Sequence, residues 1–225
     1  MRNKKISPFY LVLLAGTLAL GVFLVHHFVT QKDETKAQTT TTAKVAKKAA
    51  KVTQTTSKKT TSDPATMRKP IDWKKSSETK PYPDLTKVNN FWIKVDLKKN
   101  RTYLMSDNKV IYTMYSSGGA YHLDKKTGKQ VSDTPTGTFY IEPERGDSFF
   151  NSSSNEGANN WISWKDHGVY LFHSVPTDGS GNYNVTEAKK LGKEAASHGC
   201  IRLSVPDSKW MSQNLQTGTK VVVKG

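Results

Sequence analysis

The chain has 225 residues, of which 34 are Lys or Arg and 19 are Asp or Glu, so its net charge is +15. It contains one cysteine, which excludes an internal disulfide framework. The basic charge alone would suit a nucleic-acid binder, but no motif of interleaved basic and aromatic residues is present, which argues against that class.

The first 30 residues have the pattern of a membrane-spanning segment. Arg2, Lys4 and Lys5 precede an apolar stretch in which residues 9–25 are seventeen consecutive positions without a charge. That is longer than the roughly 7 to 15 apolar residues of a secretory signal and near the roughly 20 that span a bilayer. We expect an uncleaved signal anchor in residues 1–30, with a cytoplasmic tip and the rest of the chain outside the cell. A cleaved signal peptide is the alternative, although residues 35–37 (Thr-Lys-Ala) match a cleavage site only weakly.

Residues 31–86 are predicted to be a disordered linker rich in Thr, Lys and Ala. Large apolar residues are almost absent before Trp73, so the segment cannot bury enough surface to fold. Residues 31–80 hold 13 Lys and Arg against 5 Asp and Glu, a net of +8, so most of the excess charge lies here. We expect a solvated tether. Binding to anionic wall polymers or lipid headgroups is the alternative use of this charge.

Residues 87–225 are predicted to fold as one domain. Apolar residues alternate with polar ones as in half-buried strands, and strands are expected at residues 91–97, 102–105, 110–115, 139–141, 161–164, 169–172 and 221–223. Helices are expected at residues 185–191 and from Ser204, where Ser-Val-Pro-Asp resembles a capping box with proline in the first turn. The pattern predicts a mostly β sandwich or barrel with one or two short helices, and not a parallel α/β sheet.

Cys200 lies in residues 197–202 (Ser-His-Gly-Cys-Ile-Arg), just before the expected helix start. A nucleophilic cysteine needs an imidazole to take its proton and backbone N–H donors for the oxyanion. His198 and His173 are both candidate bases, and Gly199 allows the tight turn that exposes the thiol. An inert cysteine is normally set among apolar residues, so the polar neighbours favour a reactive one.

These residues resemble the L,D-transpeptidase catalytic domain of the YkuD type. The resemblance rests on residues 197–202 together with His173-Ser174, residues 134–137 (Thr-Pro-Thr-Gly) and residues 218–221 (Gly-Thr-Lys-Val), and it covers about residues 90–225. It implies Cys200 as the nucleophile and His173 as the base, in a β sandwich with a lid over the site. It also implies no cofactor and no metal, and acylation by carbapenems.

The resemblance implies further roles around the nucleophile. Oxyanion or substrate contacts are expected from Gly199, His198, Ser197, Arg202, Ser174, Gly118 and Gly119. Arg202 could receive a stem carboxylate or form a surface ion pair. Ser197 could orient its neighbours or fill the turn, and the two glycines could line the cleft or end a strand. His122 and His167 are expected to be ordinary loop residues.

The activity implied is peptidoglycan crosslinking. The thiolate would attack a donor tetrapeptide stem, release D-alanine and leave a thioester that an acceptor stem amine resolves, which contributes to cell wall organisation and cell shape. The same site could instead use water, as an L,D-carboxypeptidase, or attach proteins to the wall. A non-catalytic wall-binding module is the alternative from another class. The 26 residues between His173 and Cys200 exceed the spacing of compact members.

Overall fold

The computed structural model describes residues 63–225. Strands dominate this part of the chain, and its three helices are short. The strands are β1 (Phe91–Asp96), β2 (Arg101–Ser106), β3 (Lys109–Ser117), β4 (Tyr121–Leu123), β5 (Gln130–Ser132), β6 (Gly137–Tyr140), β7 (Arg145–Asn151), β8 (Glu156–Lys165), β9 (Tyr170–Ser174), β10 (Ile201–Leu203) and β11 (Lys220–Lys224). The helices are the 3-10 helix η1 (Leu85–Lys87), α1 (Val185–Ala188) and α2 (Val205–Asn214).

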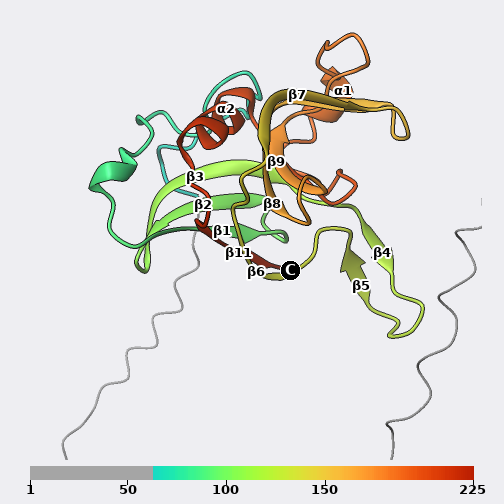
Figure 1. The fold of residues 1–225 in the computed structure, drawn as a ribbon, viewed down its shortest axis with the longest axis horizontal. Coiled ribbons are helices and arrows are strands. Elements are labelled where there is room, and N and C mark those ends of the chain that lie inside the picture. The colour runs from blue at the N-terminus through green and yellow to red at the C-terminus, as the bar shows by residue number, and fades with distance from the viewer. Residues whose placement is uncertain (1–62) are drawn as a thin grey trace, which may run out of the picture. The chain divides into compact units, whose positions relative to one another are not determined.

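Nine of the strands form one curled sheet, in the order β6-β11-β1-β2-β3-β10-β9-β8-β7 (Figure 1). The expected mostly β class is confirmed, and the sandwich or barrel expected from the sequence takes the form of this single curled sheet. Its pairs are antiparallel except β1 with β11 and β9 with β10. The remaining strands, β4 and β5, make a separate hairpin that projects from the sheet (Figure 1).

The core lies on the concave side of the sheet, and α2 covers part of it. Alternate residues of the strands supply fully buried apolar side chains, and α2 contributes Met211, which is also fully buried. Large members of this cluster are Trp164, Tyr112 and Phe172. In β1 and β11 the period-two pattern thus places one face of the strand in the core, as an amphipathic strand requires.

The two helices begin as predicted, but one is shorter. The Ser204 hydroxyl accepts a hydrogen bond from the Asp207 N–H at 3.2 Å, which caps α2 next to Pro206. Helix α1 ends at Ala188, whereas the sequence predicted a helix to residue 191. Residues 189–191 form turns that lead to Gly192, whose φ of +71° is left-handed and cannot continue a helix.

Residues 63–86 are packed against the domain, unlike the disordered linker predicted for residues 31–86. We call this segment the strap. Its Glu78 is fully buried and accepts hydrogen bonds from the Thr113 N–H at 2.5 Å and the Thr66 hydroxyl at 2.6 Å. Its Ser77 hydroxyl donates to Asp207 at 2.5 Å. The composition misled the prediction because buried polar groups, and only a few apolar ones, hold the strap.

Four strands of the domain were missing from the prediction: β4, β5, β7 and β10. Strand β10 was expected to be the approach to a helix, and it is instead a fully buried three-residue strand in the middle of the sheet.

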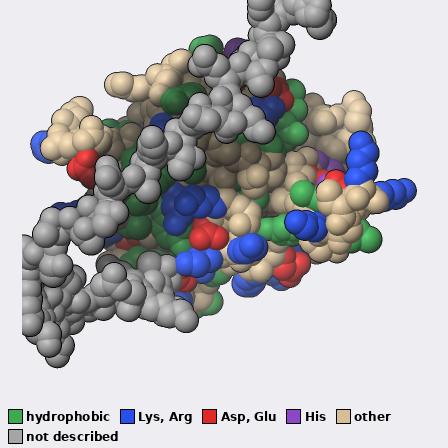
Figure 2. All heavy atoms as spheres, turned by 90° about the horizontal axis from the view of Figure 1, so that it is seen from below, with side chains coloured by type: hydrophobic (Ala, Val, Ile, Leu, Met, Phe, Trp, Pro, Cys, Tyr) green, Lys and Arg blue, Asp and Glu red, His purple; other side chains and the backbone are tan. Residues whose placement is uncertain are grey.

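Among residues 63–225, no helix has the length and apolarity to cross a membrane. The signal anchor predicted in residues 1–30 lies outside the described residues, as does the linker up to residue 62. On the face seen in Figure 2, basic side chains are interspersed with acidic ones.

Candidate active site

The site is built on two adjacent parallel strands, β9 and β10. Ile201 pairs with Phe172 and Arg202 with His173, so Cys200 comes opposite Leu171. Side chains two residues apart on a strand share a face. Cys200, Arg202 and His173 therefore lie on one face of the sheet, while Phe172 and Ile201 point into the core, where both are fully buried.

A tight turn before β10 presents Cys200, the predicted nucleophile. Gly199 has a φ of +129°, and a Cβ there would lie 2.9 Å from a ring carbon of Tyr170 and 3.1 Å from the carbonyl oxygen of Asp133. The Ser197 hydroxyl accepts a hydrogen bond from the Gly199 N–H at 3.1 Å and donates to the Cys200 carbonyl at 2.5 Å. Ser197 thus closes the turn, and Gly199 is the residue type its backbone requires.

The Cys200 thiol is a partly buried hydrogen-bond donor. Its Sγ lies 3.5 Å from the carbonyl oxygen of Val169, at the end of the turn between β8 and β9. Burial raises the pKa of Cys200 to about 11, opposed by a hydrogen bond from the Leu171 backbone and by the charge of Arg202. At neutral pH the resting group is therefore the thiol.

The His173 ring is buried and has a defined tautomer. Its Nδ1 lies 2.6 Å from the Ser174 carbonyl oxygen, and because a carbonyl only accepts, Nδ1 carries the proton. Nε2 is then the nitrogen that can accept a proton. Burial, and secondarily the charge of Arg202, lowers the pKa of His173 to about 4. The ring also meets Phe149 of β7 edge to face, with centroids 5.7 Å apart.

Cys200 and His173 line one cavity of about 550 Å³. The hairpin of β7 and β8 forms one wall and supplies apolar side chains, among them Phe149 and Trp161. The opposite wall comes from the β8–β9 turn and residues 197–202. We call the β7–β8 hairpin the lid hairpin. A cavity with two chemically reactive groups and an apolar wall is typical of a substrate site.

Arg202 lies at the base of this cavity with only 3% of its surface exposed. One guanidinium nitrogen contacts both carboxylate oxygens of Glu156, at 3.0 and 3.1 Å, and another contacts Glu187 at 2.8 Å. Two roles were expected for Arg202, binding of a stem carboxylate or a surface ion pair. The structure shows a different setting, because the guanidinium is buried and two carboxylates of the protein already share its charge. Arg202 joins β10 to the lid hairpin and to α1.

The other predicted residues fall into two groups. His198 and Ser197 line the cavity, and His198 is largely exposed with its Nδ1 3.6 Å from Glu156. Ser174, Gly118 and Gly119 are not among the lining residues. The Ser174 hydroxyl donates to the Val175 carbonyl at 2.8 Å, and the Gly119 N–H donates to Thr134 at 2.7 Å. These three residues support the walls.

Sequence reasoning missed β7, and with it the hairpin that β7 forms with β8, and it missed the carbonyl of Val169. Phe149 and Trp161 reach the cavity from 51 and 39 residues before Cys200 in the chain, where no local motif marks them. The Phe-Phe pair at 149–150 within a polar stretch is the signal that could have indicated a half-exposed strand. A backbone carbonyl leaves no such signal.

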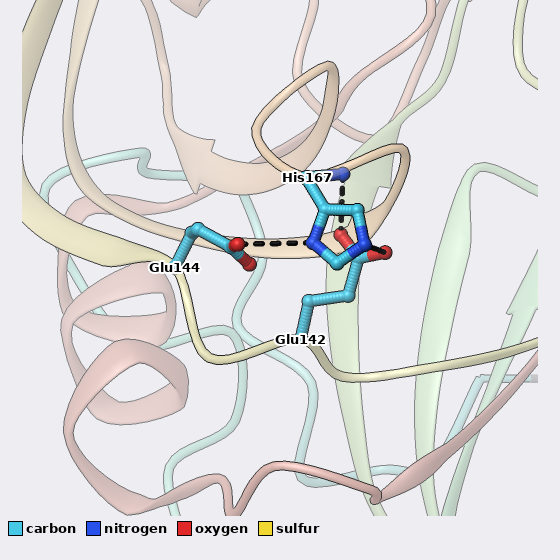
Figure 3. Close-up of side chains that lie close together, drawn as sticks. All are labelled: Glu142, Glu144 and His167. Atoms are coloured by element: carbon cyan, nitrogen blue, oxygen red, sulfur yellow. Dashed lines mark hydrogen bonds and ion pairs between the residues drawn. The ribbon is translucent and has the colours of Figure 1, made fainter.

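A second cluster of ionisable groups lies behind the β8–β9 turn. Glu142, Glu144 and His167 have ligand-type atoms within 4.8 Å of one another (Figure 3). His167 was expected to be an ordinary loop residue, yet its Nδ1 lies 2.9 Å from Glu144 and its N–H donates to Glu142 at 2.9 Å. Glu144 accepts through Oε1, while its buried Oε2 has no hydrogen-bond partner among the described residues, and we describe the group as a hydrogen-bonded cluster.

Two comparisons with known proteins show the family to which the chain belongs. The family model of the L,D-transpeptidase catalytic domain (YkuD) matches residues 90–223. The protein named "Putative L,D-transpeptidase YciB", from Bacillus subtilis (strain 168), is 48% identical over 160 residues, which are 70% of this chain and 77% of that protein. The chain therefore belongs to the L,D-transpeptidase catalytic domain family.

Two solved structures share lower similarity. A fused Zn-dependent amidase/peptidase/peptidoglycan-binding domain-containing protein from Clostridium acetobutylicum is 28% identical with a TM-score of 0.41, and the match covers 60% of this chain and 51% of that one. An L,D-transpeptidase from Mycobacterium smegmatis is 20% identical with a TM-score of 0.44, over 60% of this chain and 58% of that one. The match thus spans little more than half of each solved chain.

Proposed function

We propose that this protein is a cysteine-dependent peptidoglycan L,D-transpeptidase that works through a thioester at Cys200. The observation that carries the proposal is the placement of Cys200 and His173 on one face of two neighbouring strands, within one cavity. The nucleophile, the base and a substrate-sized cavity are the three parts that acyl transfer by a thiol needs.

The resting site holds a neutral thiol beside a neutral imidazole, since burial raises the pKa of Cys200 and lowers that of His173. Proton transfer therefore accompanies attack. As Sγ bonds to the donor carbonyl carbon, the thiol proton passes to Nε2 of His173. The Ser174 carbonyl stabilises the imidazolium that forms, because it accepts the Nδ1–H.

The oxyanion requires N–H donors that have no other partner. The Gly199 N–H already donates to Ser197, so the N–H groups of Cys200 and His198 are the proposed donors. Collapse of the tetrahedral intermediate breaks the bond to the terminal D-alanine, whose nitrogen takes the proton from His173. The acceptor amine then attacks the thioester, loses its proton to His173 and releases Cys200 as the thiol.

The apolar wall of the lid hairpin favours an amine over water as the acceptor. Phe149 and Trp161 limit the water that reaches the thioester while an acceptor stem binds. If water entered freely, the same chemistry would give the L,D-carboxypeptidase product. A protein amine as acceptor would give the protein-to-wall ligase.

We also propose an exported, single-pass membrane protein whose catalytic domain faces the cell wall. The support comes from the uncharged residues 9–25 after three basic residues, and from a basic stretch before the domain. Donor and acceptor tetrapeptide stems of peptidoglycan are the proposed partners, and the basic stretch suits anionic wall polymers.

The full chain incubated with disaccharide tetrapeptides tests the proposal. Mass spectrometry should find crosslinked dimers and released D-alanine with the native protein and none with Cys200→Ala or His173→Gln. Tripeptides without dimers would favour the carboxypeptidase. Unchanged dimer formation by Cys200→Ala would exclude the cysteine mechanism, while retention on walls without any turnover would favour a binding module. His122→Gln is the matched control, because His122 lies on the β4–β5 hairpin and does not line the cavity.

A further inference from the structure

The β8–β9 turn, residues 166–169, directly contacts the nucleophile. The Cys200 thiol lies 3.5 Å from the Val169 carbonyl oxygen, and Gly168 and Val169 line the cavity. A carbonyl accepts a hydrogen bond from the protonated thiol and repels the thiolate. The position of this one carbonyl therefore influences whether Cys200 rests as a thiol.

The turn has a backbone that needs outside support. Asp166, His167 and Gly168 are three consecutive residues with positive φ, at +59°, +48° and +98°. Left-handed residues usually occur singly, and two of these three carry side chains that disfavour the conformation. A register irregularity between Ser163 and Lys165 precedes the turn. Such bulges redirect a strand next to functional sites.

Glu142, Glu144 and His167, which we call the carboxylate clasp, provide that support. Figure 3 shows the His167 ring between the two carboxylates. Glu142 accepts the His167 N–H at 2.9 Å and the Ser163 hydroxyl at 2.6 Å. The Ser163 hydroxyl in turn accepts the Gly168 N–H at 2.9 Å. Two of the three left-handed residues are thus tied to Glu142 through their own backbone.

The clasp is itself fixed to the sheet. The Glu142 N–H donates to the Ser163 carbonyl at 2.9 Å, and the Ser163 N–H donates to the Glu144 carbonyl at 2.9 Å. Ser163 is fully buried. The carboxylates therefore come from a segment whose backbone cannot shift relative to β8, and they pass that rigidity to the turn.

We propose that the carboxylate clasp is a positioning device for the nucleophile: it holds the Val169 carbonyl against the Cys200 thiol and keeps that thiol protonated until substrate arrives. Glu142 and His167 act through Val169 and are positioning residues, since neither lines the cavity. A protonated thiol is slow to be oxidised, so the device would protect the nucleophile between turnovers.

Other charged or titratable groups lie near the Cys200 thiol and near the carboxylate clasp. His173, Arg202, Glu156 and His198 share the cavity with the thiol. Around the clasp, Lys165 and Asp166 form an ion pair of their own within β8 and the turn. The hydrogen bond and charge of Glu144, with the charge of Glu142, raise the pKa of His167, which is consistent with a protonated ring between the carboxylates.

Alkylation of the full chain by iodoacetamide tests the proposal, because Cys200 is its only thiol. The rate is measured against pH and reports the thiolate fraction. Glu142→Ala and Ser163→Ala should move the profile to lower pH. A midpoint that lies one pH unit lower corresponds to an alkylation rate at pH 7 about tenfold higher. Glu142→Gln keeps an oxygen acceptor at the same place and should stay close to the native profile.

The control is a histidine with the same kind of contact elsewhere. His122 Nδ1 lies 2.9 Å from Asp133, as His167 Nδ1 does from Glu144. His167→Ala removes the Nδ1 contact with Glu144 but keeps the backbone N–H that donates to Glu142, so it should move the alkylation profile less far than Glu142→Ala does, and His122→Ala should not move it. Circular dichroism identifies variants that fail to fold, and His167→Ala, at a 73% exposed side chain, then carries the test. Folded Glu142→Ala and His167→Ala proteins with native profiles would overturn the proposal.

This inference rests on the proposed function only for the role of Cys200 as nucleophile. Alkylation needs no substrate, so the two can fail separately. If the variants alter the alkylation profile but the native protein forms no crosslinks, the role proposed for the clasp is supported and the transpeptidase function is excluded.

Discussion

Gly199 shows how one residue type fixes the position of Cys200. Its φ of +129° is disfavoured for residues with a Cβ, and a Cβ would meet Tyr170 at 2.9 Å and Asp133 at 3.1 Å. We expect Gly199→Ala to lower the free energy of unfolding by on the order of 2 kcal/mol or more, and to slow acylation of Cys200. Urea unfolding and the rate of iodoacetamide labelling measure the two effects.

Gly128 is the matched control for that substitution. It also has a positive φ, of +67°, but a Cβ there would meet no atom within 4 Å. Gly128→Ala should lower the free energy of unfolding only by the amount that a side chain costs at a positive φ. If both variants lost the same stability, the collision with Tyr170 and Asp133 would have no energetic effect.

His173 should make the stability of the domain depend on pH. Its folded pKa is lowered to about 4 from an ordinary 6.5, so between those values the unfolded chain binds a proton that the folded protein does not. Stability is therefore lost as pH falls from about 6.5 to about 4, by about 3 kcal/mol from this group.

Replacing the ring tests this. Urea unfolding of His173→Gln between pH 4 and 7 should give a flatter profile than the native protein, and His122→Gln should follow the native curve. A native slope that survives in His173→Gln would assign the pH dependence to other groups.

The local motif at residues 197–202 was enough to propose Cys200 as the nucleophile, the resemblance added His173 as the proposed base, and both line one cavity. The setting of Arg202 was not predictable in the same way. Its partners Glu187 and Glu156 are 15 and 46 residues away in the chain, and only the folded sheet brings them to one guanidinium. A single sequence records which residues are present and not which distant ones meet.

At the scale of elements, Arg202 connects the nucleophile strand to the lid hairpin and to α1. Arg202→Gln would leave the half-buried Glu156 and Glu187 without the Arg202 cation, although Glu187 keeps Lys190 at 2.7 Å, so we expect the free energy of unfolding to fall by on the order of 2 kcal/mol. Arg202→Lys keeps the charge but not the paired contact with Glu156, and should lose less. Urea unfolding of both variants checks the order.

Arg202→Gln should also affect the lid hairpin. Arg202→Gln is expected to raise the fraction of thioester lost to water, because the turn end of the lid hairpin, where Glu156 pairs with Asn151, is no longer held by Arg202. The ratio of tripeptide to dimer in the crosslinking assay measures it. An unchanged ratio in a folded variant would separate Arg202 from control of the acceptor.

Strand periodicity predicted most of the sheet but not its middle. Burial alternates along β1 and β11, and β2, β3 and β9, which contain runs of buried residues, also lie where their apolar residues predicted them. Strand β10 has three residues, all buried, so it has no alternation to detect. Strand β7 is the opposite case, with most residues exposed at the edge of the sheet. Periodicity identifies half-buried strands only.

For the whole molecule, the strap is part of the folded unit although the family match begins only at residue 90. Asp207 is fully buried and accepts hydrogen bonds from Ser77 at 2.5 Å and Tyr82 at 2.7 Å. A chain that starts at residue 87 would leave this carboxylate without those donors. We expect it to be less stable than one starting at residue 63 by about 3 kcal/mol or more.

Thermal unfolding of the two truncated chains measures the difference. Tyr82→Phe in the longer chain is the milder control, because it removes one donor and keeps the ring stacked on Trp210. Equal midpoints for the two truncations would mean that the strap adds no stability.

The recessed position of Cys200 also bears on how copies of this protein meet. Two sulfurs must approach to about 2 Å to form a bond between molecules. Here the only thiol of the chain lies in the cavity lined by the lid hairpin and donates a hydrogen bond to the Val169 carbonyl. A second copy therefore cannot bring its own thiol alongside. Small oxidants can enter where a neighbouring molecule cannot. On a non-reducing gel, even after storage in air, the folded protein should therefore run as a single unlinked chain.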